Sequence, residues 1–377
     1  MAIKPSEFFN ILIDNGVDFF TGVPDSLLKD ICLYIDNNVS NNEHIIAANE
    51  GSAIALAAGY YLGKKSSLPL VYMQNSGFGN AINPLLSLCD PEVYSIPMLV
   101  MIGWRGFPGA KDEPQHKKQG KVQLDLMKSM DFKYEILSNE IEEYNNKILN
   151  LINYAKENNR PAFLLIKKGT FGKVLGKNNK LYQEEMTRQD ALEIILDIVG
   201  SNSPIISTTG KTSREIFEIR KKNNQPHDQD FLTVGSMGHC SSIALGISVA
   251  QPNTKVICID GDGSMLMHLG SLTSIASLNP KNLLHILMNN KVHESVGGQE
   301  TAAKNIDLLS IVSSLGTINT SKAINRIELK DELTALINVD GPSFLEVVIK
   351  PGSRKDLGRP DIKPIDIKDK FIRFLDK

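Results

Sequence analysis

The sequence predicts an α/β protein of two domains, each a mostly parallel sheet covered by helices. At 377 residues the chain is longer than one ordinary hydrophobic core supports. Short apolar runs alternate with amphipathic stretches along its length, as expected of parallel strands buried on both faces. Residues 167–190 are polar and rich in Gly, Lys and Asn, which indicates a linker. The predicted domains are therefore residues 1–175 and 187–377.

The strands are predicted from runs of Val, Ile, Leu and Met that are bounded by polar or turn-forming residues. In chain order these runs are residues 68–74, 97–103, 161–167, 204–208, 255–260, 282–288 and 343–349. Residues 141–159 and 188–201 have the apolar spacing of amphipathic helices. This alternation of strand and helix favours parallel sheets in both domains.

Composition excludes several classes of protein. The formal net charge of −2 gives no reason to expect binding to nucleic acid or to an anionic membrane. The longest apolar stretch is too short to span a bilayer, and the N-terminal segment has acidic residues where a signal peptide would be apolar. The four cysteines lack CxxC spacing, so neither a zinc knuckle nor a disulfide framework is indicated. We expect a reduced, cytoplasmic protein.

The segment ICIDGDGSMLMH, residues 257–268, places Asp262 between two glycines at the end of a predicted strand. An apolar helical pattern follows from Met265 to Ala276, and the next strand runs into Asn289-Asn290. Because carboxyl ends of neighbouring parallel strands share one rim, Asp262 and Asn290 are expected to lie together. Their carboxylate and amide oxygens suit Mg²⁺, and glycines before a helix N-terminus let a phosphate approach the backbone.

GDG followed, after 25 intervening residues, by Asn-Asn resembles the motif of thiamine-diphosphate enzymes. The resemblance implies thiamine diphosphate and Mg²⁺ as cofactors, with Asp262, Asn290 and the carbonyl of Val292 on the metal. It also assigns Gly261, Gly263 and Ser264 to the diphosphate. The alternative is an Asp-Gly turn with an unrelated Asn pair. No GxxxxGK[ST] occurs, and no GxGxxG follows a strand, which removes the competing phosphate loops.

Two further segments match this class of enzyme. In residues 45–63, Glu50 follows a strand-like run and opens a helix rich in Gly and Ala. Such a Glu activates the aminopyrimidine in the family, although by itself it could simply stabilise the helix N-terminus. Residues 233–248 match a segment that holds the cofactor in its bent shape, which implies roles for three residues: Gly235, Ser236 and Met237. Met237 could instead fill core.

The order of these motifs matches pyruvate-decarboxylase-like enzymes without their central domain. The resemblance makes residues 1–175 the pyrimidine-binding (PYR) domain and residues 187–377 the diphosphate- and Mg-binding (PP) domain. In such enzymes the cofactor lies between domains of two subunits. We therefore expect a homodimer or homotetramer with active sites at the subunit interface.

Several segments together are similar to the phosphonopyruvate decarboxylase family, with sulfopyruvate decarboxylases as close kin. They are GVPDSLLKDI, NEGSAIALAAGYYLG, NSGFGNAINPLLSL, GWRGFPGAKDEPQHKKQGK and NNKVHESVGGQ. The resemblance implies decarboxylation of 3-phosphonopyruvate, a small 2-keto acid, to phosphonoacetaldehyde and CO₂ in 2-aminoethylphosphonate biosynthesis. A sulfopyruvate decarboxylase and a carboligase of the acetolactate synthase type are the alternatives. Lys291 departs from the family, in which a small residue such as Gly is frequent there.

Basic residues after the strand at 97–103 support an anionic substrate. Arg105, Lys111 and His116 are the candidates for binding the phosphonate, since Arg pairs well with such oxygens. A solvated basic loop balanced by Asp112 and Glu113 is the alternative.

Three residues are candidates for orienting the substrate or donating a proton: Asp25, His116 and His293. Asp25 could instead cap a helix that begins at Ser26-Leu27.

Overall fold

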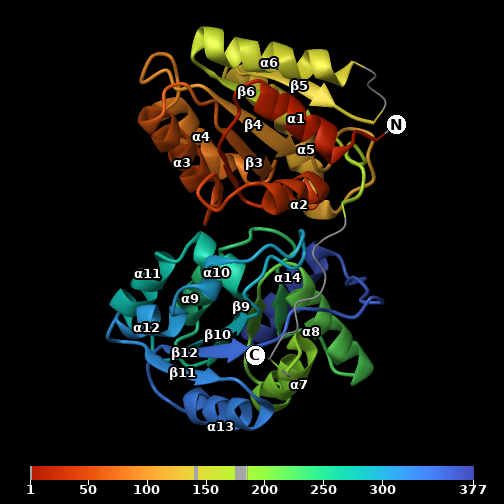
Figure 1. Cartoon of the computed structure of the whole chain (residues 1–377). Helices are drawn as coiled ribbons and strands as arrows, with labels where there is room; N and C mark the ends of the chain where they lie inside the picture. The colour runs from red at the N-terminus through yellow and green to blue at the C-terminus, as the bar shows by residue number, and fades with distance from the viewer. Residues whose placement is uncertain (1, 140–142, 175–183, 185) are drawn as a thin grey trace. The chain divides into compact units, whose positions relative to one another are not determined.

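The computed structural model describes residues 2–139, 143–174, 184 and 186–377. The chain forms two compact units, Met1–Asn179 with Val296–Gln299, and Lys180–Ser295 with Glu300–Lys377. Residues 141–142 of a predicted helix, and 175–183 and 185 of the predicted linker, lie outside the described residues. Each unit holds one six-stranded sheet whose strand pairs are all parallel, with helices on both faces, which confirms the predicted fold class (Figure 1).

The sheet of the first unit has the strand order β2-β1-β3-β4-β6-β5. Its strands are β1 (Phe20–Gly22), β2 (His44–Ile46), β3 (Leu70–Gln74), β4 (Met98–Gly103), β5 (Lys133–Leu137) and β6 (Pro161–Ile166). Its helices are α1 (Pro5–Asp14), α2 (Lys29–Asn38), α3 (Glu50–Gly63), α4 (Phe78–Ser87), α5 (Pro114–Ser129) and α6 (Tyr144–Asn158).

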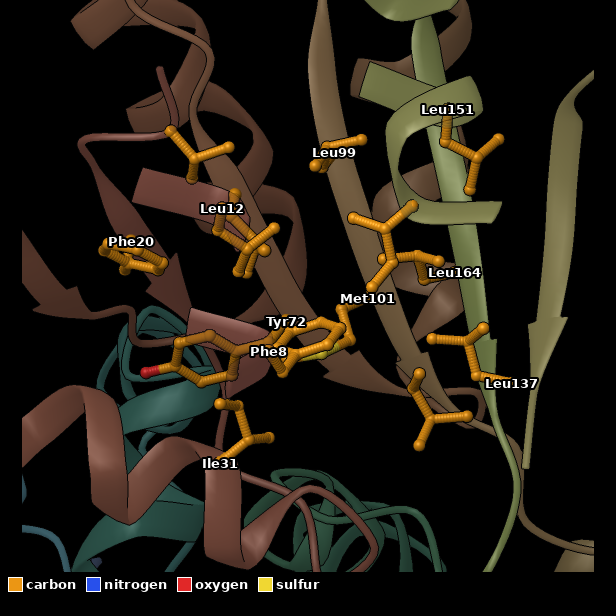
Figure 2. Close-up of a cluster of buried hydrophobic side chains, with 14 of the residues drawn as sticks. Phe8, Leu12, Phe20, Ile31, Tyr72, Leu99, Met101, Leu137, Leu151 and Leu164 are labelled. Atoms are coloured by element: carbon orange, nitrogen blue, oxygen red, sulfur yellow. The ribbon is translucent and has the colours of Figure 1, made fainter. Parts of the chain in front are cut away.

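Alternate residues of these strands enter two separate cores, because successive side chains point to opposite faces of a sheet. On one face, Phe8 of α1 and Leu151 of α6 pack with strand residues such as Leu99 (Figure 2). On the other face, Ala53 of α3 packs with residues such as Val100. Burial on both faces explains why these strands read as continuous apolar runs.

The second unit repeats this architecture with the strand order β11-β12-β10-β9-β7-β8. Its strands are β7 (Ile205–Ser207), β8 (Asp230–Leu232), β9 (Val256–Gly261), β10 (Leu283–Asn289), β11 (Asn319–Ala323) and β12 (Ser343–Val348). Its α-helices are α7 (Arg188–Val199), α8 (Lys211–Lys222), α9 (Cys240–Ala250), α10 (Asp262–Met267), α11 (Ser271–Leu278), α12 (Leu308–Ser313), α13 (Arg326–Ile337) and α14 (Pro364–Leu375).

The single helix predicted after GDG is two helices. α10 ends at Met267, His268 leaves the helical conformation, and α11 starts after Gly270. The apolar spacing continues across the break because it reports which residues are buried, not whether the hydrogen-bond ladder is continuous. α11 ends before Asn279, which takes the left-handed conformation that often terminates helices.

None of the described helices is long and apolar enough to cross a membrane.

Candidate active site

The second unit brings Asp262 and Asn290 to one rim of its sheet. β9 and β10 pair in parallel, with Gly261 opposite Met288, so the residues that follow each strand emerge at the same edge. Asp262 is the first residue of α10 and is 3% exposed. Thr301 Oγ1 donates a 2.5 Å hydrogen bond to its Oδ2, and the backbone amides of Gly263 and Asn290 also stabilise the carboxylate.

The Asp262 carboxylate is chemically suited to a divalent cation. Burial raises its pKa to about 6, since the charged form loses hydration. Thr301 and backbone amides are its polar neighbours, and none of the salt bridges among the described residues includes it. A bound cation would compensate this buried charge, which no basic side chain pairs with in the described part of the chain.

Within the described ranges there is no group of three or more His, Cys, Asp or Glu that could hold a metal. The Mg²⁺ site predicted from the sequence is of a different kind, with one carboxylate, one amide oxygen and one carbonyl. These are hard oxygen donors, which Mg²⁺ prefers, and phosphate oxygens and water usually complete its shell. The residues present therefore fit the ion.

Asn290 and Val292 form a tight turn beside Asp262. The side-chain nitrogen of Asn290, Nδ2, donates to Glu294 Oε2 at 3.0 Å. The side-chain oxygen, Oδ1, accepts from the backbone amide of Val292 at 3.1 Å. The Val292 carbonyl accepts from the Glu294 amide at 2.9 Å and keeps a second lone pair. Both oxygens therefore retain acceptor capacity for a metal.

The turn Gly235–Gly238 is tied to the GDG segment through one hydroxyl. Ser264 Oγ accepts from the Gly238 amide and from Thr208 Oγ1, both at 3.0 Å. Ser236 and Gly238 have left-handed φ values of 57° and 89°. A Cβ added to Gly263 would lie 3.6 Å from Met237 Cε, so the glycine brings the two predicted cofactor segments close together.

His293 also lies beside Gly263. A Cβ on that glycine would lie 3.0 Å from the imidazole Cε1. Burial lowers the pKa of His293 to about 4, so the ring is neutral near pH 7.

In the first unit, Glu50 is the buried first residue of α3. Asn49 caps this helix by accepting from the Ser52 amide at 2.9 Å, so capping alone does not explain Glu50. Asn80 Nδ2 donates to Glu50 Oε2 at 2.8 Å. A Cβ on Gly77 would lie 2.0 Å from Glu50 Oε1, which shows how closely the carboxylate packs against that backbone.

Asp25 is also buried, at 1% exposure, at the end of the sheet where β3 and β4 finish. Gln74 Nε2 donates to its Oδ1 at 2.5 Å, and the Leu27 amide donates to its Oδ2 at 2.8 Å. The alternative reading of Asp25 as a helix cap is wrong, because α2 begins at Lys29 and has Leu28 at its N-cap. Burial raises the pKa of Asp25.

Arg105 is already paired within the chain. Its Nε and one terminal nitrogen bind the two oxygens of Asp112 at 2.8 and 2.5 Å, and its other terminal nitrogen donates to Ser26 Oγ at 2.9 Å. The hydrogen bond from Arg105 lowers the pKa of Asp112. Three of five guanidinium N–H groups are therefore used. Lys111 is exposed.

His116 lies near this ion pair on α5. Its ring is buried, and Nδ1 has no hydrogen-bond partner in the described part of the chain. Burial, with a smaller effect of Arg105, lowers its pKa to about 4. The first unit thus gathers Asp25, Arg105 and His116 in one polar region, while Lys111 points to solvent.

Sequence reasoning missed the residues that hold these side chains in place. Thr301 contacts Asp262, Asn80 contacts Glu50, and Glu294 contacts Asn290. Thr301 and Asn80 are distant in sequence from the side chains that they contact. Glu294 is different, because it stands four positions after Asn290 in NNKVHES. That spacing is the one signal that the sequence offered.

Comparison with known proteins identifies the family. Residues 7–129 match the N-terminal TPP binding domain of thiamine pyrophosphate enzymes, and residues 208–347 match the C-terminal TPP binding domain. Phosphonopyruvate decarboxylase of Streptomyces viridochromogenes is 32% identical over 96% of this chain and 92% of its own length. The chain belongs to the phosphonopyruvate decarboxylase family.

Two other curated proteins are similar to nearly the whole chain. Phosphonopyruvate decarboxylase of Streptomyces hygroscopicus is 33% identical over 99% of this chain and 94% of its own. Sulfopyruvate decarboxylase of Methanosarcina acetivorans is 26% identical over 100% and 98%. The chain is therefore an enzyme, a carboxy-lyase that decarboxylates a keto acid with thiamine diphosphate.

Proposed function

We propose that this enzyme decarboxylates 3-phosphonopyruvate to phosphonoacetaldehyde and CO₂ with the help of Mg²⁺, as a step of phosphonate biosynthesis. The observation that carries the proposal is the pair of relatives named phosphonopyruvate decarboxylase, at 32% and 33% identity over nearly the whole chain. The relative named sulfopyruvate decarboxylase is 26% identical over a similar extent. Sulfopyruvate, the substrate in the name of this relative, is therefore the second candidate substrate.

The residues proposed to bind the cofactor form two sets, one in each unit. Asp262, Asn290 and the Val292 carbonyl would hold Mg²⁺, and the backbone around Gly261, Gly263 and Ser264 would receive the diphosphate. Gly235, Ser236 and Met237 would support the bent cofactor, and Glu50 would bind its aminopyrimidine. Thiamine diphosphate supplies the nucleophilic carbon and the electron sink for loss of CO₂. The domain roles at residues 1–175 and 187–377 follow from this assignment.

Among the three candidate proton donors, Asp25 suits the role best. The pKa of His116 and that of His293 are each lowered to about 4, so both rings are neutral at pH 7 and offer only weak acidity. The pKa of Asp25 is raised by burial, so its carboxyl group keeps a proton to higher pH than an ordinary Asp. In this proposal the neutral histidines orient the substrate by hydrogen bonds.

Arg105 would bind the phosphonate through its remaining N–H groups. Asp112 fixes the guanidinium plane, which leaves one N–H on each terminal nitrogen for an anion. Lys111, being exposed, adds positive charge near this region. Arg105→Lys should therefore raise KM for the acid more than it lowers kcat, because Lys cannot reproduce the planar fork.

We also propose that the enzyme is a homodimer or a dimer of dimers. α3 and α9 are apolar nearly all round, yet Leu62 of α3 is 70% exposed and Val249 of α9 is 55% exposed. A helix of this composition is normally buried. A second copy of the chain that covers these faces would bury them and complete each active site.

An assay of CO₂ release with three acids tests the substrate. Phosphonopyruvate, sulfopyruvate and pyruvate would be compared with thiamine diphosphate and Mg²⁺ present in excess. We expect the highest kcat/KM with phosphonopyruvate and little turnover of pyruvate, because pyruvate has no second anionic group, beside its carboxylate, for Arg105 to bind. A higher kcat/KM with sulfopyruvate would overturn the proposal, and turnover of pyruvate to a ligated product would favour a carboligase.

A further inference from the structure

Four charged side chains form a network beside Asn290. Arg188 of α7 binds both oxygens of Glu215 of α8, at 2.9 and 3.1 Å. Its remaining terminal nitrogen binds Glu294 Oε2 at 3.0 Å, and Lys211 binds Glu294 Oε1 at 2.6 Å. Arg188 and Glu215 are 5% and 3% exposed, so this is a largely buried network.

Glu294 is the member of this network that touches a proposed metal ligand. Its Oε2 accepts from Asn290 Nδ2 at 3.0 Å while it also pairs with Arg188. Lys211 Nζ donates to the other carboxylate oxygen, so each oxygen of Glu294 is held by a basic side chain. With both oxygens accepting from basic side chains, the carboxylate can only accept a hydrogen bond from Asn290.

Because the Glu294 carboxylate is an acceptor, it decides which end of the Asn290 side-chain amide faces the sheet edge where β9 and β10 end. The side chain of Asn has an oxygen end and an NH₂ end, and rotation by half a turn exchanges them. Only the NH₂ end can bind Glu294, and the Val292 amide donates to the oxygen end at 3.1 Å. The two contacts select the same orientation, in which the second lone pair of Oδ1 is available to a cation.

We propose that Glu294 is a positioning residue for the metal site, which fixes the Asn290 amide so that its oxygen is presented to Mg²⁺. This inference rests on the proposed role of Asn290 as a metal ligand. Arg188 and Lys211 act through Glu294 by holding its two carboxylate oxygens in place. Glu215 belongs to the same network but does not contact Asn290, and it provides a matched control.

The test measures Mg²⁺ dependence of cofactor binding and not turnover. Thiamine diphosphate is titrated calorimetrically into the apoenzyme at a series of Mg²⁺ concentrations, with Glu294→Gln, Glu215→Gln and the parent protein. Because a glutamine side chain offers both a donor and an acceptor, it no longer selects one orientation of the Asn290 amide. Glu294→Gln should raise the half-saturating Mg²⁺ concentration at least tenfold. Glu215→Gln should lower the melting temperature yet leave that concentration within twofold.

A second substitution tests the orientation itself. Asn290→Asp in the Glu294→Gln background presents two equivalent oxygens, so no orientation is needed, and the introduced glutamine can donate to the introduced carboxylate. We expect the double variant to recover most of the lost Mg²⁺ affinity. Failure to recover, or an equal loss in Glu215→Gln, would show that the network acts only on stability and would overturn the inference.

Asp262→Asn separates this inference from the proposed function. If Asp262→Asn raises the Mg²⁺ requirement and Glu294→Gln does not, Glu294 is not a positioning residue, but the metal site stands. If Asp262→Asn also leaves the requirement unchanged, the proposed metal site itself is wrong.

Discussion

Asp262 is a buried carboxylate with no basic side chain paired to it among the described residues, and this single fact has two consequences. In the free protein it raises the pKa of the group to about 6, because the charge is poorly hydrated. With a cation bound, the same burial would strengthen the attraction, because the surroundings are less polar than water. Burial therefore destabilises the charged carboxylate when no cation is bound, and it strengthens the attraction to a cation when one is bound.

Asp262→Asn separates these two effects. We expect the substitution to weaken binding of thiamine diphosphate in Mg²⁺ by more than tenfold, because the anionic ligand is lost. The melting temperature of the apoprotein at pH 7.5 should stay equal or rise, because a buried charge is removed. Calorimetric titration and thermal unfolding check both. Unchanged affinity would contradict the metal assignment.

Glu50 differs from Asp262 in what its removal should change. Glu50→Gln should still bind thiamine diphosphate, because the proposed diphosphate grip lies in the other unit. Exchange of the C2 proton of the bound cofactor with deuterium should slow by roughly 10²-fold or more, as expected when an acid–base group is lost. Quenched-flow NMR measures this exchange. A normal rate would remove Glu50 from the mechanism.

His116 makes a prediction about pH. Its pKa is lowered to about 4 in the folded protein, whereas an unfolded His titrates near 6.5. Between these pH values the unfolded chain binds more protons at this site than the folded chain does. The contribution of His116 to the free energy of unfolding is therefore fully present above pH 6.5 and is lost as the pH falls towards 4. The loss is about 1.4 kcal/mol per pH unit at most.

Urea unfolding at pH 7 and pH 4.5 tests this pH dependence of stability. The first unit should lose more stability between these values in the parent protein than in His116→Gln, by up to about 3 kcal/mol. Equal pH dependence in both proteins would show that His116 is not held neutral by burial.

At the scale of elements, the strands predicted from the sequence were those buried on both faces. β3, β4, β6, β9, β10 and β12 contain long apolar runs, and all were placed within about two residues. β11 has the sequence NTSKA and lies at a sheet edge, where one side needs no apolar cover, so no periodicity marked it. β1 and β8 are only three residues each and were missed, whereas β7 is equally short but was predicted because it begins with Ile205-Ile206.

The positions of the candidate site residues were predictable where they depend on the ends of strands. Asp262 and Asn290 were placed together because topology alone brings the ends of adjacent parallel strands to one rim. Thr301 and Asn80 could not be inferred, since their positions depend on how a loop and a helix fold back on the sheet. Lys291 shows a third case: its φ of 60° lies in the left-handed region that favours glycine, which gives a physical reason for the small residue that the resemblance leads one to expect there.

The start of α4 supports the Glu50 side chain and gives a test of that element. Gly77→Ala would place a Cβ 2.0 Å from Glu50 Oε1, so either the carboxylate or the start of α4 must move. We expect turnover to fall at least tenfold with the fold retained. Gly79→Ala is the matched control, because nothing lies within 4 Å of its Cβ.

Alanine at 79 should leave activity unchanged and add up to about 1 kcal/mol of stability, as Ala favours a helix over Gly. Circular dichroism and the CO₂ assay distinguish the two variants. Equal activity of Gly77→Ala and Gly79→Ala would show that the position of the Glu50 carboxylate is not critical.

At the scale of the whole molecule, the exposed apolar faces of α3 and α9 support assembly. If Glu50 of one chain and Asp262 of the partner belong to the same active site, two inactive variants can complement each other. In a mixed dimer of Glu50→Gln and Asp262→Asn, one site carries both lesions and the other carries none. If both residues instead belonged to one site within a single chain, every site would keep a lesion.

Mixing the two variants under conditions that allow subunit exchange therefore decides between these arrangements. Random pairing makes about half of the dimers mixed, so about a quarter of all sites should recover activity. Exchange is verified independently by native mass spectrometry of a size-tagged subunit. Each variant incubated alone under the same conditions is the control and should stay inactive. No recovery after verified exchange would refute the shared site, while recovery near a quarter would support the dimer and both residues together.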